Sequence, residues 1–208
     1  MAGLSVCRLV AECTDRLVKA LWAETTVELS QPGPLCLVAL GGYGRRELAP
    51  HSDLDLLLLR GARTALDRVQ PIAEGFTKLL WDVGRTVGWS IRAPAECAQV
   101  AKEDHTIRTA LLDCRFLTGD ERIYRALTDR VMRDLLSHNA AQFIADKSNE
   151  LQIRRRKYGD SIFLLEPDVK HGEGGLRDLQ AALWIAQARF RARGIRALLK
   201  QSILSNSD

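Results

Sequence analysis

The sequence predicts an α+β protein with a small mixed β-sheet core and a mostly helical C-terminal part. Three short apolar segments predict the sheet, at residues 35–40, 53–59 and 87–92, and apolar residues at helical spacing predict the helices around it. We expect three parts. These are an N-terminal helix packed on the core (residues 1–34), the core itself (35–118), and a helical region with a Gly-rich loop (119–208).

Apolar residues recur with helical spacing in segments 4–24, 64–83, 95–101, 105–116, 121–136 and 140–157, and again from Leu176 onward. Pro71 lies inside the second segment, so that helix either begins there or kinks. Residues 31–34 contain two prolines and separate the first helix from the first strand. Residues 118–120 predict a turn that caps the next helix, and residues 159–175 are rich in Gly, Asp and Pro and predict a loop.

Composition limits the class of protein. The 208 residues are 46% hydrophobic and 27% charged, which is ordinary for a globular chain. A net charge of +4 and an aromatic content of 6% do not predict a nucleic-acid-binding surface. The five cysteines form no C-x-x-C pair, which favours reduced thiols in a cytoplasmic protein. No apolar run reaches the roughly 18 residues of a membrane span, so we expect no membrane partner.

Two aspartates open the second predicted strand. Side chains alternate along a strand, so Asp53 and Asp55 share one face, with Cα atoms roughly 6.5 Å apart. The unbroken apolar run after Asp55 predicts a strand that is covered on both faces. Two carboxylates in such a position repel and lose solvation, and a cation keeps them charged. A hard divalent ion, Mg²⁺ or Mn²⁺, suits these oxygens and commonly arrives with substrate phosphates.

A glycine turn lies between the first two predicted strands. Gly41 and Gly42 directly follow the first strand, where the missing Cβ lets the backbone approach a phosphate. Free N–H groups at the start of the next turn point toward an anion. Arg45 or Arg46 adds a possible bidentate phosphate contact. Together with the aspartates, this predicts a phosphate cradle beside a metal site, as nucleotidyl transfer requires.

The wording of this stretch resembles the signature of the polymerase-β-like nucleotidyltransferase superfamily. Residues 41–55, G-G-Y-G-R-R-E-L-A-P-H-S-D-L-D, are similar in particular to the bacterial PII uridylyltransferase branch (GlnD). Residues 166–179, with the run G-G-L-R-D, resemble a second motif of that branch. The two stretches lie more than a hundred residues apart and in the expected order.

The resemblance implies an enzyme that moves UMP from UTP onto a tyrosine hydroxyl of the signal-transduction protein PII and releases pyrophosphate. Asp53 and Asp55 would then hold the metal and act as the catalytic pair. Gly41, Gly42 and Ser52 would seat the phosphates, with Arg45 beside them. In the second motif, the residues expected to contact triphosphate or the acceptor are Lys170, Gly174, Gly175 and Arg177.

The branch implies a longer polypeptide, with an HD-type hydrolase domain and glutamine-sensing ACT domains. The four histidines here form no H-D dipeptide, so we expect the transferase part alone, without glutamine sensing or demodification.

Two alternatives stay open: a stand-alone nucleotidyltransferase with another acceptor, and a nucleotide-binding regulatory module without turnover. The superfamily places a third carboxylate on a neighbouring strand, where this sequence has Ser90, and the general base is therefore unassigned. Asp82, Glu96, Asp104 and Asp113 are possible substitutes.

Overall fold

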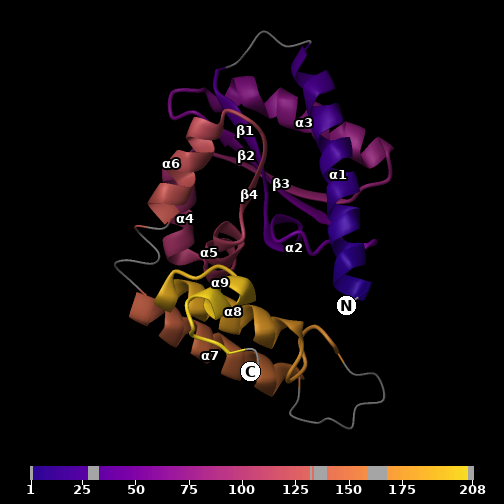
Figure 1. The fold of residues 1–208 in the computed structure, drawn as a ribbon. Helices are drawn as coiled ribbons and strands as arrows, with labels where there is room; N and C mark the ends of the chain where they lie inside the picture. Colours follow the sequence, from indigo (N-terminus) through magenta and orange to yellow (C-terminus); the bar gives the residue numbers. More distant parts are fainter. Residues whose placement is uncertain (1, 28–32, 132, 134–139, 159–167, 206–208) are drawn as a thin grey trace. The chain divides into compact units, whose positions relative to one another are not determined.

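A computed structural model describes residues 2–27, 33–131, 133, 140–158 and 168–205. The chain forms two compact units, Met1–Val131 and Met132–Asp208, and each is described by itself (Figure 1). The predicted division into 1–34, 35–118 and 119–208 remains a prediction about domains.

The first unit is built on a four-stranded sheet in the order β3-β2-β1-β4. Strand β1 pairs antiparallel with β2 and β4, whereas β2 and β3 run parallel. The sheet is therefore mixed, and the predicted α+β class is confirmed. The strands span Leu35–Ala39 (β1), Leu54–Arg60 (β2), Val87–Arg92 (β3) and Arg115–Gly119 (β4).

Strand β4 was not predicted. We expected residues 115 and 116 to end a helix and residues 118–120 to form a turn, but helix α5 ends at Leu112 and an edge strand follows. Only Leu117 of this strand is buried, so its sequence lacks the alternation that marks a strand. The strand forms because it pairs with β1, and a pairing between segments so far apart in sequence cannot be predicted from the local residue pattern. Asp120 begins the next helix as expected, accepting from the Arg122 N–H at 2.9 Å.

Helices cover both faces of the sheet (Figure 1). Alternate residues of β2, Leu54, Leu56 and Leu58, join the core beneath α1 and α3. The opposite face carries Asp55, Leu57 and Leu59 and lies toward α4, α5 and α6. The helices span Ala2–Val27 (α1), Gly41–Gly44 (α2), Leu66–Asp82 (α3), Pro94–Glu103 (α4), His105–Leu112 (α5) and Glu121–Val131 (α6).

Helix α3 begins before Pro71, which lies inside it. No helix in the described part of the chain combines the length and apolar character needed to cross a bilayer.

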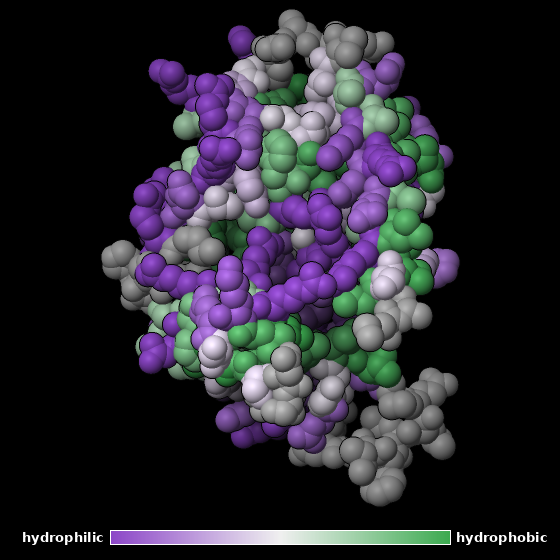
Figure 2. Space-filling model, viewed as in Figure 1, coloured by the Kyte–Doolittle hydropathy of each residue, from purple (hydrophilic) through white to green (hydrophobic). Residues whose placement is uncertain are grey.

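The second unit contains α7 (Ala140–Tyr158), α8 (Leu176–Phe190) and α9 (Ile195–Lys200). Helices α7 and α8 pack together and are joined by an ion pair between Arg154 and Asp178 of 2.5 Å. Figure 2 shows hydrophobic surface over α8, where Leu176 and Leu179 are about half exposed. Predictions for residues 28–32, 134–139 and 159–167 lie outside the described residues.

Candidate active site

The carboxylate of Asp55 lies between two glycines at one edge of the sheet. Asp55 belongs to β2, and its carbonyl accepts from the N–H of Leu40, the residue before the glycine turn, at 2.9 Å. A Cβ added at Gly41 would lie 3.2 Å from Asp55 Oδ2, and one at Gly88 would lie 3.2 Å from Oδ1. Three segments distant in sequence therefore meet at this carboxylate, which is exposed to solvent.

The glycines of the turn differ in whether their backbone conformation or their surroundings would tolerate a side chain. Gly41 has a φ of +53°, which disfavours a side chain, and it faces Asp55. At Gly44 a Cβ would lie 2.2 Å from the carbonyl oxygen of Asp113, so the turn and the end of α5 touch through backbone. A Cβ at Gly42 would make only ordinary contacts, the nearest at 3.5 Å. The fold does not require glycine at position 42.

Asp53 and Ser52 lie in the loop just before β2, and both are exposed. The Ser52 N–H donates to the carbonyl of Ala49 at 3.1 Å, and the Leu54 N–H donates to the carbonyl of Thr86 at 2.9 Å. These bonds tie the loop down on both sides of Asp53. Within the described chain, no hydrogen bond or ion pair engages the Asp53 side chain.

A cleft of about 260 Å³ opens beside Asp55. One wall is the start of β3, from Gly88 to Ser90, and the other is α5, through Thr106, Ile107 and Ala110. Leu40 and Leu56 form the base of the cleft with Asp55.

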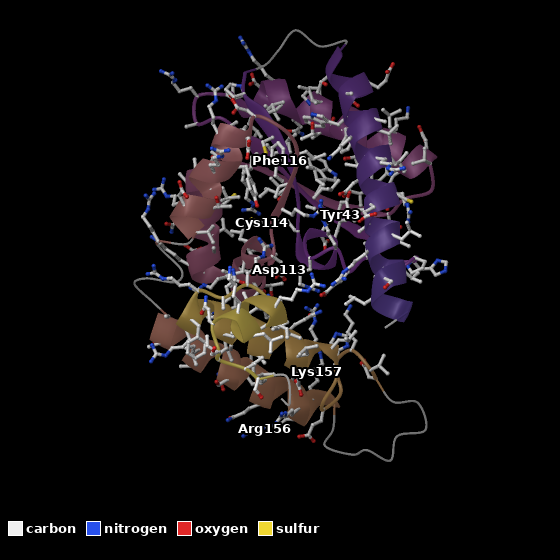
Figure 3. All side chains as sticks on the ribbon, in the orientation of Figure 1. Tyr43, Asp113, Cys114, Phe116, Arg156 and Lys157 are labelled. Carbon is white, nitrogen blue, oxygen red and sulfur yellow. The ribbon has the colours of Figure 1, made fainter. Side chains whose placement is uncertain are left out.

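Two arginines brace the glycine turn through ion pairs. Arg45 binds Asp113 at 2.5 Å and Glu47 at 2.7 Å, so this guanidinium already holds two carboxylates. Arg115 of β4 donates twice to Asp15 of α1, at 2.7 and 2.9 Å, and reaches the carbonyls of Tyr43 and Gly44 at 3.2 and 3.3 Å. Figure 3 labels Tyr43 and Asp113, which belong to these two braces. The phosphate contact expected of Arg45 stays a prediction.

The ring of Tyr43 is buried beneath Arg115, whose guanidinium lies 5.3 Å from the ring centroid. Burial raises the pKa of the Tyr43 phenol far above its ordinary value, and the charge of Asp15 acts in the same direction. This tyrosine therefore stays protonated and serves as packing under the turn.

Three acids considered as substitutes for the missing third carboxylate have structural partners. Glu96 pairs with Arg60 and accepts from the Ala93 N–H at 2.7 Å. Asp104 caps α5 by accepting from the N–H groups of Thr106 and Ile107. Asp113, buried, is the partner of Arg45 described above. Asp82 is exposed at the end of α3.

The second group of predicted residues lies in the other unit, at the start of α8. The N–H of Gly174 donates to Asp178 Oδ2 at 3.0 Å, and that of Gly175 donates to the carbonyl of Gly172 at 3.0 Å. Arg177 donates to Gln180 at 3.0 Å, and Lys170 is exposed. The backbone N–H groups of Gly174 and Gly175 are thus used within the turn, and the phosphate role of this second group of residues stays a prediction.

Sequence reasoning missed two parts of this site. Gly88 lies inside the predicted strand 87–92, and a glycine inside a strand often marks a close approach of another group, but its place beside Asp55 was not predicted. The α5 wall had no local signal, because Thr106, Ile107 and Ala110 acquire their place only through the packing of α5 against α4 and α2.

The donor set fits a divalent ion. Within the described part of the chain, no cluster of three or more His, Cys, Asp or Glu side chains could hold a metal. Asp53 and Asp55 supply carboxylate oxygens at an open edge where neighbouring glycines leave room. Such a site suits Mg²⁺ or Mn²⁺ that takes its remaining ligands from water and phosphate.

Two family models match the chain. The model described as a putative nucleotidyltransferase family, DUF294, matches residues 3–88, and the GlnD PII-uridylyltransferase model matches residues 142–208. The first match contains the glycine turn and both aspartates, and the second contains the G-G-L-R-D motif.

Curated relatives agree with these matches. A bifunctional uridylyltransferase/uridylyl-removing enzyme of Caulobacter vibrioides is 41% identical over 89% of this chain and 20% of its own length. The relative of the same name from Pseudomonas aeruginosa is 36% identical over 100% of this chain and 23% of its own length. The chain thus spans between a fifth and a quarter of these relatives.

A solved structure titled "Crystal structure of the toxin-antitoxin with AMP-PNP" aligns with a TM-score of 0.33 at 13% identity, over 66% of this chain and 92% of that one. This likeness is too distant to carry an argument. The family models and the curated relatives confirm the resemblance that the motifs predicted: the chain is related to the GlnD PII-uridylyltransferases and carries nucleotidyltransferase-family sequence.

Proposed function

We propose that this chain is a nucleotidyltransferase that moves UMP from UTP onto a tyrosine hydroxyl of a PII protein. The observation that carries the proposal is the position of Asp55 between Gly41 and Gly88, at the mouth of an open cleft. An exposed carboxylate beside a glycine turn and a cleft can serve a phosphate-bound metal. A carboxylate that only stabilised the fold would have no need of the cleft.

The residues of the site have separate proposed roles in holding the metal ion and in binding the phosphates. Asp53 and Asp55 would hold a divalent ion, which when bound would neutralise charge on the triphosphate. Gly42 lets the backbone approach a phosphate, and the braces through Arg45 and Arg115 fix the turn before substrate arrives. Backbone N–H donors that are held in place before the substrate binds stabilise developing charge, because they need not reorganise during the reaction. Lys170 in the second unit is a further candidate contact to phosphate or acceptor.

The uracil base and the PII acceptor rest on the relatives. Their names describe uridylyl transfer and removal, and one family model names PII as the protein modified. The chain spans a small part of those relatives, so we assign it the transferring reaction alone.

Cysteine chemistry is disfavoured at two positions. Burial raises the pKa of Cys36 and of Cys97 to about 12, so neither thiol is a ready nucleophile. Five free cysteines also fit a cytoplasmic location.

The test is transfer to purified PII. The protein is incubated with Mg²⁺, PII and either UTP or ATP, and the mass of PII is followed. We expect a gain of one UMP from UTP, none from ATP, and none with PII whose acceptor tyrosine is replaced by phenylalanine. Transfer from ATP, or to an unrelated acceptor only, would point to a different nucleotidyltransferase. Tight UTP binding without transfer, unchanged in Asp55→Asn, would point to a binding module.

A further inference from the structure

Arg46, directly after the glycine turn and its brace, combines a strained backbone with an exposed position. Its φ of +62° lies in the left-handed region, which glycine enters without strain and a residue with a side chain does not. Within the described part of the chain, no hydrogen bond or ion pair engages the Arg46 side chain. A role as a solvated surface charge would not explain a conformation that glycine adopts at lower free energy.

The preceding arginine shows the opposite arrangement. The guanidinium of Arg45 is largely buried and binds Asp113 at 2.5 Å and Glu47 at 2.7 Å. A phosphate at Arg45 would lie beside two carboxylates and be repelled by them, whereas the described chain places no carboxylate on Arg46. Two adjacent arginines therefore differ in what their guanidinium groups can still bind.

The backbone at Arg46 folds back beside the glycine turn. The N–H of Arg46 donates to the carbonyl of Tyr43 at 3.1 Å, and the N–H of Glu47 donates to the carbonyl of Gly42 at 2.8 Å. The carbonyl oxygen of Glu47 would lie 3.5 Å from a Cβ added at Gly42. Arg46 is therefore held next to the glycine whose open side the proposed function gives to a phosphate.

The loop between α2 and β2 carries an unpaired charge near each end. Arg46 lies at its start and Asp53 near its finish, and no ion pair joins these two exposed residues or engages either with another described side chain. Opposite charges held apart on one loop suit a ligand that itself carries both charges. A triphosphate with its divalent ion is such a ligand, because carboxylates bind the ion and a guanidinium binds phosphate oxygens.

We propose that Arg46 binds the phosphates that leave as pyrophosphate. The inference rests on the proposed function and adds a catalytic residue to its site. Gly41 lies beside Asp55 and Arg46 lies at the far end of the turn, so Arg46 meets the phosphates farther from the reacting α-phosphorus. The acceptor oxygen bonds to that phosphorus, the bond to the β-phosphate oxygen breaks, and the acceptor proton passes to water. The guanidinium of Arg46 neutralises the charge that grows on the leaving pyrophosphate.

The test replaces Arg46 by glycine, because this change removes the guanidinium and also relieves the backbone. A residue kept for function in a strained conformation should then give a protein that is more stable and less active. We expect Arg46→Gly to raise the melting temperature by about 3 °C. It should lower kcat for transfer from UTP about thirtyfold, as loss of a hydrogen-bonded charge does. Arg46→Lys keeps the charge and should restore part of the rate without the gain in stability.

Arg191 provides the matched control. It is also an arginine with a positive φ, +54°, and it lies at the C-terminal end of α8 in the other unit. Arg191→Gly should relieve the same kind of backbone strain and leave kcat for transfer at the wild-type value.

A second readout needs no turnover. Binding of pyrophosphate with Mg²⁺ is measured by calorimetry, and we expect its affinity to fall about thirtyfold in Arg46→Gly and to stay unchanged in Arg191→Gly. Equal affinity in wild type and Arg46→Gly would overturn the proposal. A fall in melting temperature of Arg46→Gly together with its rate would assign Arg46 to the fold and would also overturn it. A wild-type protein that binds pyrophosphate through Arg46 but transfers nothing to PII would refute the proposed function alone.

Discussion

The molecule contains two glycine turns that look alike in sequence and differ in what their glycines do. In the second turn, at residues 172–175, added Cβ atoms at Gly172 and Gly175 would lie 2.7 and 2.9 Å from carbonyl oxygens of the turn itself, and Gly174 has a φ of +72°. The turn needs all three glycines for its own shape. In the first turn, at residues 41–44, Gly42 has no such need. A glycine that the fold does not require indicates that the space beside its backbone is kept open for a ligand.

Each turn also has its own aspartate. Asp178 accepts from the Gly174 N–H and binds Arg154, so it is committed to holding α7, α8 and the turn together. Net of burial, which opposes ionisation, these contacts hold the pKa of Asp178 below its usual range. Asp55 lies at an exposed position beside a cleft and between two glycines of the site. We infer that the first turn serves chemistry and the second serves structure.

The largest expected effect separates the two aspartates. Asp55→Asn should lower transfer to PII roughly a thousandfold, because a metal-holding carboxylate accounts for several kcal/mol of charge stabilisation. Its melting temperature should stay near wild type, since the side chain is exposed. Asp178→Asn should lower the melting temperature and leave the rate per folded molecule within a few-fold. Initial rates and thermal melts measure both. A loss of stability in Asp55→Asn together with a loss of rate in Asp178→Asn would contradict the assignment of chemistry to the first turn and structure to the second.

The next largest effect concerns the brace that fixes the first turn. Arg115→Met leaves Asp15 without its partner in a largely buried place and should lower the free energy of unfolding by about 2 kcal/mol. It should also raise the KM for UTP, because the carbonyls of Tyr43 and Gly44 lose a donor. Urea titrations and initial rates measure these changes. The double variant with Asp15→Leu should regain stability but not the KM.

A matched pair of glycine substitutions sharpens the comparison directly. Gly42→Ala should keep the free energy of unfolding within about 1 kcal/mol of wild type, on the stabilising side, because alanine favours a helical position. It should raise the KM for UTP several-fold. Gly174→Ala should lose about 1 kcal/mol through its positive φ. Its KM for UTP should not change. Equal KM values in the two variants would remove the distinction between the turns.

The smallest effect is a pH dependence in the second turn. Asp168 accepts from the N–H groups of His171 and Lys170, and these bonds lower its pKa below the usual value. Its contribution to stability is therefore fully present above the unfolded pKa of about 3.9 and is lost as the pH falls through the lower folded value. An NMR titration of the Asp168 carboxyl group should show this low pKa. In Asp168→Asn, the His171 amide shift should lose its acid transition.

The sequence predicted those features that local pattern encodes. Strands 35–40, 53–59 and 87–92 agree with β1, β2 and β3 to within a residue at each end. The predicted turn and Asp55 also come together, because β1 and β2 are antiparallel neighbours and Gly41 follows one close to the start of the other. Such contacts between consecutive strands are readable from order along the chain.

Contacts between segments far apart in the sequence could not be predicted from local sequence patterns. Strand β4 exists through pairing with β1, and the partners of Arg45 and Arg115 lie on α5 and α1. A sequence pattern does not distinguish an arginine that binds phosphate from one that binds a buried aspartate. The same limit applies to Gly88 and to the α5 wall, whose roles depend on the parallel pairing of β2 and β3.

The brace from Arg115 has a consequence for synthesis on the ribosome. Residues 41–55 leave the exit tunnel well before residue 115, and domains fold largely in the order in which they emerge. Until β4 arrives and Arg115 reaches Asp15, the nascent turn has only part of its support. Nucleotide affinity should therefore rise late in translation, so a stalled nascent chain ending before β4 should bind UTP poorly although Asp53 and Asp55 are already present.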